Sequence, residues 1–215
     1  MEQAELRARV AEFAQRMHAA GMVVGTAGNV SARVAGEEKI AITPSSLPYP
    51  EITAADVQLL DFAGNQLTDG RPPSFERGVH LAVYRARNDV GAVFHTHATY
   101  CSVLASLRRP LPPVIEELVP YVGGTVEVAE YAASGGDALA QNVVSALGDR
   151  SAVLLANHGN LCCGRDLTKA YKVAELVERV AQIYVLASTI GKPVALPDEV
   201  VANERLMYDA MRNWG

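Results

Sequence analysis

Hydrophobic positions along the chain recur at two periods, and each period predicts one kind of element. Spacing of three to four residues predicts helices at 2–20, 74–88, 100–107, 136–147 and 167–190, with a short helix in the tail. Alternation and short apolar runs predict strands at 30–34, 40–42, 90–97 and 152–156, a hairpin over 57–68 and a strand or extended segment across 114–129. Ser74 is the expected N-cap of its helix.

These strands cluster in hairpins and do not alternate one-to-one with helices. No internal repeat, low-complexity segment or linker interrupts the pattern. We therefore expect one α/β domain over residues 1–215, with a largely antiparallel sheet covered by helices rather than a doubly wound parallel sheet. Neither GxGxxG after a strand nor a P-loop is present, so the sequence gives no support for a nucleotide cofactor.

Composition narrows the class of protein. The 215 residues are 49% hydrophobic and 20% charged, which suits a globular core, and the net charge of −5 argues against nucleic acid as a partner. No apolar run approaches the roughly 20 residues that span a bilayer. The charged N-terminus lacks a signal-peptide core, and the three cysteines (Cys101, Cys162 and Cys163) have no disulfide framework spacing. We expect a cytoplasmic protein with reduced, mostly buried thiols and no membrane partner.

Two histidines stand two residues apart at the end of a predicted strand, in VFHTHATY. His95 and His97 would face the same side of that strand and could share a metal ion, although such pairs also occur as solvated residues. His158, beside a glycine after the strand 152–156, is the candidate third ligand, because a catalytic zinc site uses three protein ligands and an open position. Alone, His158 could equally be structural.

Other polar residues accompany the histidines. Glu76, at the start of a predicted helix, could be an acid/base or a metal ligand, or could simply complement the helix dipole. His80 lies one turn later and could support the site or be structural, and His18 is expected on a solvated face. The loops GTAGNVS and TPSS are rich in amides and hydroxyls that can bind an anion, although such loops are mostly turns.

These segments occur together in one family. Through GTAGNVSAR, ITPSSLPY, PSFERGVHLAVYRA, VFHTHATYCSVLA, VGGTVEVAEYA and LLANHGNLCCG, the chain resembles the class II aldolase/adducin-head family, specifically the branch of L-fuculose-1-phosphate aldolase. The resemblance covers nearly the whole chain. It implies a three-layer αβα fold with a nine-stranded, largely antiparallel sheet, and a homotetramer with active sites between subunits.

The resemblance also assigns roles. It implies one Zn²⁺ per subunit on His95, His97 and His158, with Mn²⁺ or Co²⁺ also accepted by imidazole ligands. Glu76 is then the acid/base and can approach the metal in the empty site. The substrate phosphate is expected at Gly28, Asn29, Ser45, Ser46, Ser74 and Phe75. The implied reaction is reversible cleavage of a ketose 1-phosphate such as L-fuculose 1-phosphate to dihydroxyacetone phosphate and a short aldehyde, through a metal-stabilised enediolate.

Some positions depart from the fuculose-phosphate enzyme. Phe75 replaces a serine in the phosphate pocket, Ser46 stands where a glycine is usual, and Glu117 replaces a tyrosine that reaches a neighbouring subunit's site. Tyr121, four residues later, could substitute for it, and Tyr208 in the tail could be a second tyrosine contributed across the interface. Substrate recognition is therefore expected to differ from that of the fuculose-phosphate enzyme.

Several activities stay open. The same metal and carboxylate would serve a decarboxylase of a sugar-acid phosphate, a dehydratase of methylthioribulose phosphate or an aldolase on a non-phosphorylated substrate. Glu76 argues against a 4-epimerase, which typically has Asp there. An adducin-like assembly module, which keeps the fold without the metal, is disfavoured by the retention of all three histidines and Glu76.

Overall fold

The computed structural model describes residues 2–213. One mixed sheet runs through it in the strand order β3-β2-β1-β4-β7-β6-β5. The strands are β1 (Asn29–Arg33), β2 (Lys39–Ile42), β3 (Gln58–Asp61), β4 (Ala92–Thr96), β5 (Val128–Ala129), β6 (Ala152–Leu155) and β7 (Gly159–Gly164). Of the strands in residues 2–213, only β5 and β6 pair in parallel. The predicted α/β fold with a largely antiparallel sheet is confirmed, but the sheet has seven strands between residues 2 and 213 rather than nine.

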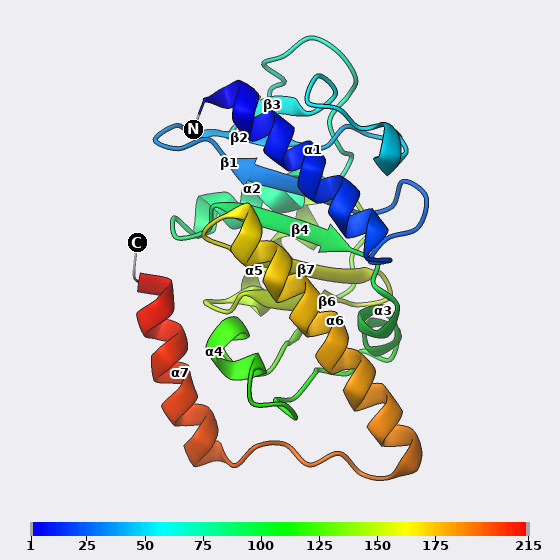
Figure 1. Cartoon of the computed structure of the whole chain (residues 1–215), viewed down its shortest axis with the longest axis vertical. Helices are drawn as coiled ribbons and strands as arrows, with labels where there is room; N and C mark the ends of the chain where they lie inside the picture. The colour runs from blue at the N-terminus through cyan, green and yellow to red at the C-terminus, as the bar shows by residue number, and fades with distance from the viewer. Residues whose placement is uncertain (1, 214–215) are drawn as a thin grey trace.

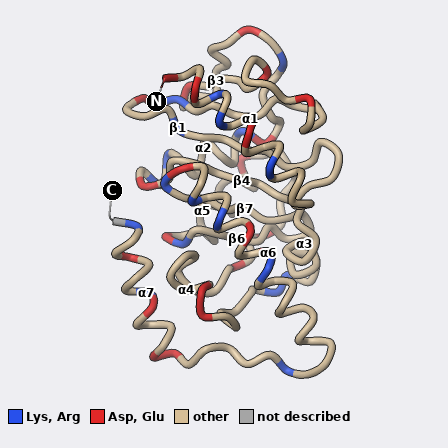
Figure 2. The backbone as a smooth tube through the Cα atoms, viewed as in Figure 1, with Lys and Arg blue, Asp and Glu red and all other residues tan. Residues whose placement is uncertain are grey.

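Helices cover both faces of the sheet and make three layers (Figure 1). The helices are α1 (Gln3–Ala19), α2 (Arg77–Ala86), α3 (Thr99–Ser106), α4 (Leu118–Val122), α5 (Asp137–Leu147), α6 (Leu167–Ile190) and α7 (Asp198–Asn213), with a 3-10 turn at Tyr49–Glu51. One buried cluster packs α1, α3 and α6 on one face, and a second packs α2 and α5 on the other. Acidic and basic residues are both scattered along the outer helices (Figure 2).

The central strand β4 explains why the sheet is covered on both faces. All five of its residues are buried. Phe94 points into the α1/α6 layer, where its ring packs edge-on against Phe13 and Tyr171 with centroids 6.2 and 5.8 Å away. Val93 faces the α2/α5 layer. The apolar run before His95 is therefore a doubly buried strand, which fixes where its polar end emerges.

The segment 114–129 differs most from the prediction. It was expected to be extended, but it forms the short helix α4 and only the two-residue strand β5. Leu118, Val119 and Val122 are buried at helical spacing, and Gly123 ends the helix with a φ of 95°. Tertiary burial of this apolar stripe outweighs the β-branched composition that favoured a strand.

Three smaller differences concern one unpredicted strand, the start of one helix and the length of another. The strand β7 was not predicted, because its sequence GNLCCG lacks alternation and each residue from Gly159 to Cys163 is buried. The helix α2 begins at Arg77 with Glu76 at its N-cap, so the prediction of Ser74 as N-cap is wrong; the Ser74 hydroxyl instead accepts the Glu76 N–H at 3.3 Å. The tail helix α7 is 16 residues long.

The sequence also predicted reduced, mostly buried thiols and no membrane partner. Cys101, Cys162 and Cys163 are free and buried, as expected. Among the helices between residues 2 and 213, none combines the length and apolar character needed to cross a bilayer.

Candidate metal and acid–base site

Three imidazoles meet where β4 ends beside the turn between β6 and β7. His95 is in β4, His97 follows it by two residues on the same side, and His158 comes from the turn. The three ring centroids are 4.7 to 4.9 Å apart, and one ring nitrogen from each lies within 4.8 Å of the others. The structure therefore brings together the three histidines that the sequence singled out from separate segments.

The backbone of the NHG turn holds His158 against β4. Asn157 has a φ of 55°, a left-handed conformation that asparagine tolerates better than most residues. A Cβ at Gly159 would collide with the carbonyl oxygen of Thr96, so the turn can approach β4 this closely only with glycine. Asn160 then pairs with Thr96, and its carbonyl oxygen accepts a hydrogen bond from Nδ1 of His95 at 3.0 Å.

Glu76 completes the cluster from the opposite side. Its Oε2 lies 3.1 Å from Nε2 of His95, and its Oε1 lies 3.2 Å from Nε2 of His158. The amide nitrogen of Asn29 donates to Oε2 at 3.1 Å. The side chain of Glu76 is only 13% exposed, so this carboxylate is held between two histidines and one amide with little contact with water.

The electrostatics favour an ionised carboxylate at Glu76 and neutral imidazoles at His97 and His158. Burial by itself raises the pKa of Glu76. The hydrogen bond and positive charge of His95, the charge of His158 and the hydrogen bond from Asn29 together outweigh burial and hold the pKa well below its usual range. Burial, with the nearby His95 and His158, lowers the pKa of His97 to about 4. Burial also lowers the pKa of His158.

This donor set fits a divalent cation. Nδ1 of His95 donates to the carbonyl oxygen of Asn160, so its Nε2 is the nitrogen that faces the cluster. That Nε2 lies 3.1 Å from Oε2 of Glu76 and 3.0 Å from Nε2 of His97. These ring nitrogens and the carboxylate converge on one small region, and a positive charge there, a proton or a cation, stabilises the arrangement. Three imidazoles at this separation are the ligand set of catalytic zinc sites.

A second layer of buried polar groups lies behind Glu76, and the sequence predicted only part of it. Asn29 and Ser31 share one face of β1, while His80 and Tyr84 follow Glu76 at four-residue intervals along α2. The Asn29 amide oxygen bonds Nε2 of His80, whose Nδ1 lies 2.6 Å from the Ser31 hydroxyl; that hydroxyl is 2.8 Å from the Tyr84 hydroxyl. The spacings ExxxHxxxY and NxS are the sequence signal that could have identified this layer.

Three of the residues expected at the phosphate, Gly28, Ser45 and Ser74, lie on loops next to the site. A Cβ at Gly28 would lie 2.7 Å from the carbonyl oxygen of His95, so this loop runs directly against β4. The loop of Ser45 runs beside that of Ser74, with Ser45 N–H donating to Pro72 and Ser74 N–H donating to Thr43. The Asn29 side chain, by contrast, is already bonded to Glu76 and His80, so its amide supports the carboxylate.

Two of the departing residues have clear surroundings. Ser46 is exposed and has a φ of 56°, a left-handed conformation, which explains why glycine suits this position. The Phe75 side chain is 65% exposed, and its ring covers Gly135 just before α5. Phe75 also lines a cavity between α2 and α5. The structure thus packs Phe75 toward the α5 layer.

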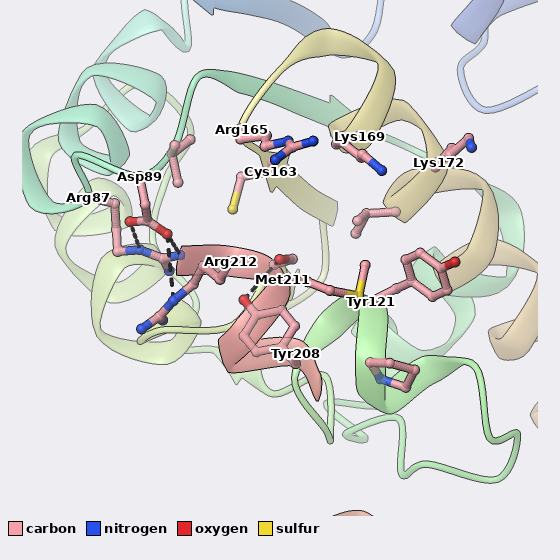
Figure 3. A pocket seen from close by; sticks show the side chains of 15 residues that line it. Arg87, Asp89, Tyr121, Cys163, Arg165, Lys169, Lys172, Tyr208, Met211 and Arg212 are labelled. Carbon is pink, nitrogen blue, oxygen red and sulfur yellow. Dashed lines mark hydrogen bonds and ion pairs between the residues drawn. The ribbon is translucent and has the colours of Figure 1, made fainter. Parts of the chain in front are cut away.

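The candidates for a contribution across subunits do not approach the histidines of their own chain. Glu117 is exposed at the N-cap of α4. Tyr121 and Tyr208 line a different cavity, of about 250 Å³, between α4, α7 and the start of α6 (Figure 3). The Tyr208 side chain is buried there, and its hydroxyl donates to the Asp149 carbonyl at 2.7 Å and lies 3.0 Å from the Ser151 hydroxyl.

Comparison with known proteins agrees with this geometry. Residues 8–185 match the model of the class II aldolase and adducin N-terminal domain. The chain is 37% identical to a 5-deoxy-D-ribulose 1-phosphate aldolase of Bacillus thuringiensis, over 92% of both chains. It is 36% identical to an L-fuculose phosphate aldolase of Escherichia coli, over 94% of this chain and 93% of the relative.

A solved structure of an L-fuculose 1-phosphate aldolase superposes with a TM-score of 0.90 and 38% identity, covering 97% of this chain and 96% of that one. Fold and sequence are therefore shared over nearly the full length of both proteins. The chain belongs to the class II aldolase and adducin N-terminal domain family, in the branch of the L-fuculose-phosphate aldolases.

Proposed function

We propose that the protein is a metal-dependent aldolase that reversibly cleaves a small ketose 1-phosphate, such as L-fuculose 1-phosphate or 5-deoxyribulose 1-phosphate, to dihydroxyacetone phosphate and a short aldehyde. The observation that carries this proposal is the ionised Glu76 carboxylate facing two of three convergent imidazoles. The named relatives act on sugar phosphates of this size. A protein that served only as an assembly module would not need a buried carboxylate beside three clustered imidazoles.

The histidines would hold one cation per subunit, zinc by preference for three neutral imidazoles, with manganese or cobalt as alternatives. Bound there, the cation would act as a Lewis acid and stabilise the negative charge that develops beside a carbonyl when the carbon–carbon bond breaks. Glu76 moves the proton. Its low pKa keeps it ionised at neutral pH, so it can remove a proton from the carbon next to the carbonyl during condensation and return it during cleavage.

The phosphate would lie in the cradle beside the histidines. Ser45, Ser46 and Ser74 offer hydroxyls, and the loop at Gly28 offers backbone amides, which can bind a phosphate without lysine or arginine. These residues come from two loops that run side by side and from the loop packed on β4. The aldehyde end of the substrate would then face outward, where residues of a neighbouring subunit can reach it.

We place this site at the interface of a homotetramer. Several apolar side chains that an oligomer would cover are exposed in the single chain: Phe75, Tyr121, Leu206 and Met207 are 65%, 42%, 68% and 57% exposed. Glu117 and Tyr121 on α4 are the residues that would approach a neighbour's site. Light scattering coupled to gel filtration tests the assembly, and a monomer that is fully active would contradict it.

The activity is tested by a retro-aldol assay over a panel of ketose 1-phosphates and their non-phosphorylated counterparts, with the metal content of the protein measured. Cleavage of at least one phosphorylated member is expected, with the Glu76→Gln variant keeping its metal and losing most of its turnover. No cleavage by the metal-loaded protein would overturn the proposal. Release of carbon dioxide, or a product lighter by one water, would assign a decarboxylase or a dehydratase.

A further inference from the structure

The buried hydrogen bonds behind Glu76 have only one consistent set of directions. The Asn29 NH₂ group donates to Oε2 of Glu76 at 3.1 Å, and this carboxylate oxygen accepts, so the amide oxygen faces His80. That oxygen also only accepts, so Nε2 of His80 must carry the proton and Nδ1 must be the acceptor. Each end of the Asn29 amide is therefore specified by its neighbour.

The same reasoning continues into the core. Because Nδ1 of His80 accepts, the Ser31 hydroxyl spends its only proton on that bond at 2.6 Å. The Tyr84 hydroxyl must then donate to Ser31 at 2.8 Å. Ser31, His80 and Tyr84 are fully buried, so no water competes for these bonds and each partner fixes the next.

The orientation of Asn29 matters because the wrong one is repulsive. If the amide rotated by half a turn, its oxygen would face Oε2 of Glu76 and two acceptors would meet in a site of low dielectric constant. Within the described part of the chain, the hydrogen bond from His80 alone distinguishes the two ends of the amide on the side away from Glu76. Without that bond, Asn29 could turn and Glu76 would lose its donor.

We propose that His80, held in one tautomer by Ser31 and Tyr84, is a positioning residue that orients the Asn29 amide and thereby fixes the Glu76 carboxylate for proton transfer. The inference rests on the proposed aldolase function. The two ring nitrogens of His80 are bonded to Asn29 and Ser31, so its hydrogen bonds reach Glu76 through the Asn29 amide. Burial lowers the pKa of His80 to about 3, which keeps the imidazole in the neutral form that the tautomer requires.

The first test compares two variants in the same helix. His80→Leu removes the donor and puts an apolar side chain of similar size in its place. It should lower kcat of the retro-aldol reaction 10- to 100-fold, with KM within about twofold and the metal content unchanged. Val83→Ala, at a fully buried position of α2 that takes no part in the hydrogen bonds, is the control for lost stability. An equal loss of kcat in both variants would reduce His80 to a packing residue.

A double-mutant cycle separates positioning from packing. In an Asn29→Ala background the amide is gone, so adding His80→Leu should change kcat by less than twofold. His80→Gln, which can still donate from its amide nitrogen toward Asn29, should recover much of the activity that His80→Leu loses. Fully additive losses, or no recovery in His80→Gln, would contradict the proposal.

A measurement without substrate distinguishes this inference from the proposed function. In nitrogen-15 NMR spectra, the side-chain amide of Asn29 should give one protected signal in the wild type and in Val83→Ala, and should lose that protection in His80→Leu. If the wild type cleaves no sugar phosphate, the proposed function is wrong. The Asn29 signal then still tests whether His80 orients the Asn29 amide. An Asn29 signal unchanged in His80→Leu would overturn the inference.

Discussion

Nε2 of His95 lies 3.1 Å from Oε2 of Glu76, while Nδ1 of the same ring donates to the carbonyl oxygen of Asn160. At this separation a proton or a metal ion held close to both atoms stabilises the pair. The arrangement explains how one site can serve two purposes. The lowered pKa values of His97 and His158 leave these imidazoles neutral and able to bind a metal ion, and the Glu76 carboxylate is ionised and able to take a proton.

The first prediction concerns the metal ligands. His95→Ala should lower the metal content after desalting from near one ion per chain to less than one tenth, because two remaining imidazoles cannot hold the ion tightly. Elemental analysis of the purified protein measures this directly. His18→Ala is the matched control, because His18 stacks on Tyr49 away from the cluster and its loss should leave the metal in place. Metal retained at wild-type stoichiometry in His95→Ala would refute the ligand assignment.

The second prediction concerns the close approach of the Gly28 loop to β4. Gly28→Ala should lower the free energy of unfolding by about 2–4 kcal/mol, since the φ of 77° is unfavourable for alanine and the new Cβ would lie 2.7 Å from the His95 carbonyl oxygen. Urea denaturation gives the number.

Gly36→Ala is the control for that substitution. Gly36 has a similar φ of 73° but no atom within 4 Å of its Cβ position, so only the conformational cost of roughly 1 kcal/mol should remain. Equal losses in the two variants would show that contact with β4 contributes nothing.

The sequence could predict the site better than the elements that surround it. In a strand, the two-residue spacing of His95 and His97 puts both side chains on the same face. The NHG sequence places His158 at a strand end. The distances between them depend on the pairing of β4 with β7, and β7 was not predicted because GNLCCG is buried on both faces and has no alternation.

The differences in the fold have a common physical cause. The spacing of apolar residues identifies an element only when one face is buried and the other faces solvent, as in α1 or α6. The segment 114–129 packs against α6 and α7, so burial in tertiary contacts decided between helix and strand there. Ser74 and Phe75 could not be placed from local pattern either, because the helix begins at Arg77 and the Phe75 ring turns toward Gly135.

The third prediction is a pH dependence of stability that originates at His80. In the unfolded chain His80 binds a proton below its ordinary pKa of about 6.5, whereas burial lowers the pKa in the folded chain to about 3. Between these values the unfolded state holds more protons, so the free energy of unfolding falls as the pH is lowered. The contribution approaches about 1.4 kcal/mol per pH unit.

This contribution can be isolated by comparing the wild type with His80→Leu in urea denaturation between pH 4 and 6. Both proteins should be freed of metal first, so that release of the ion does not add to the slope. The variant should lose stability less steeply than the wild type as the pH falls. Parallel curves for the two proteins would mean that His80 takes up its proton equally well in the folded chain.

The fourth prediction decides between two roles for Tyr208. The resemblance to the fuculose-phosphate enzymes suggested that this tyrosine could act in a neighbouring subunit, but its hydroxyl is bonded to Asp149 and Ser151 of its own chain and its side chain is buried. Tyr208→Phe should therefore lower the free energy of unfolding by about 1 kcal/mol and change kcat less than twofold. Denaturation and steady-state kinetics on the same preparation measure both. A tenfold loss of kcat at unchanged stability would instead require α7 to leave its place on α4 and carry Tyr208 to the next subunit.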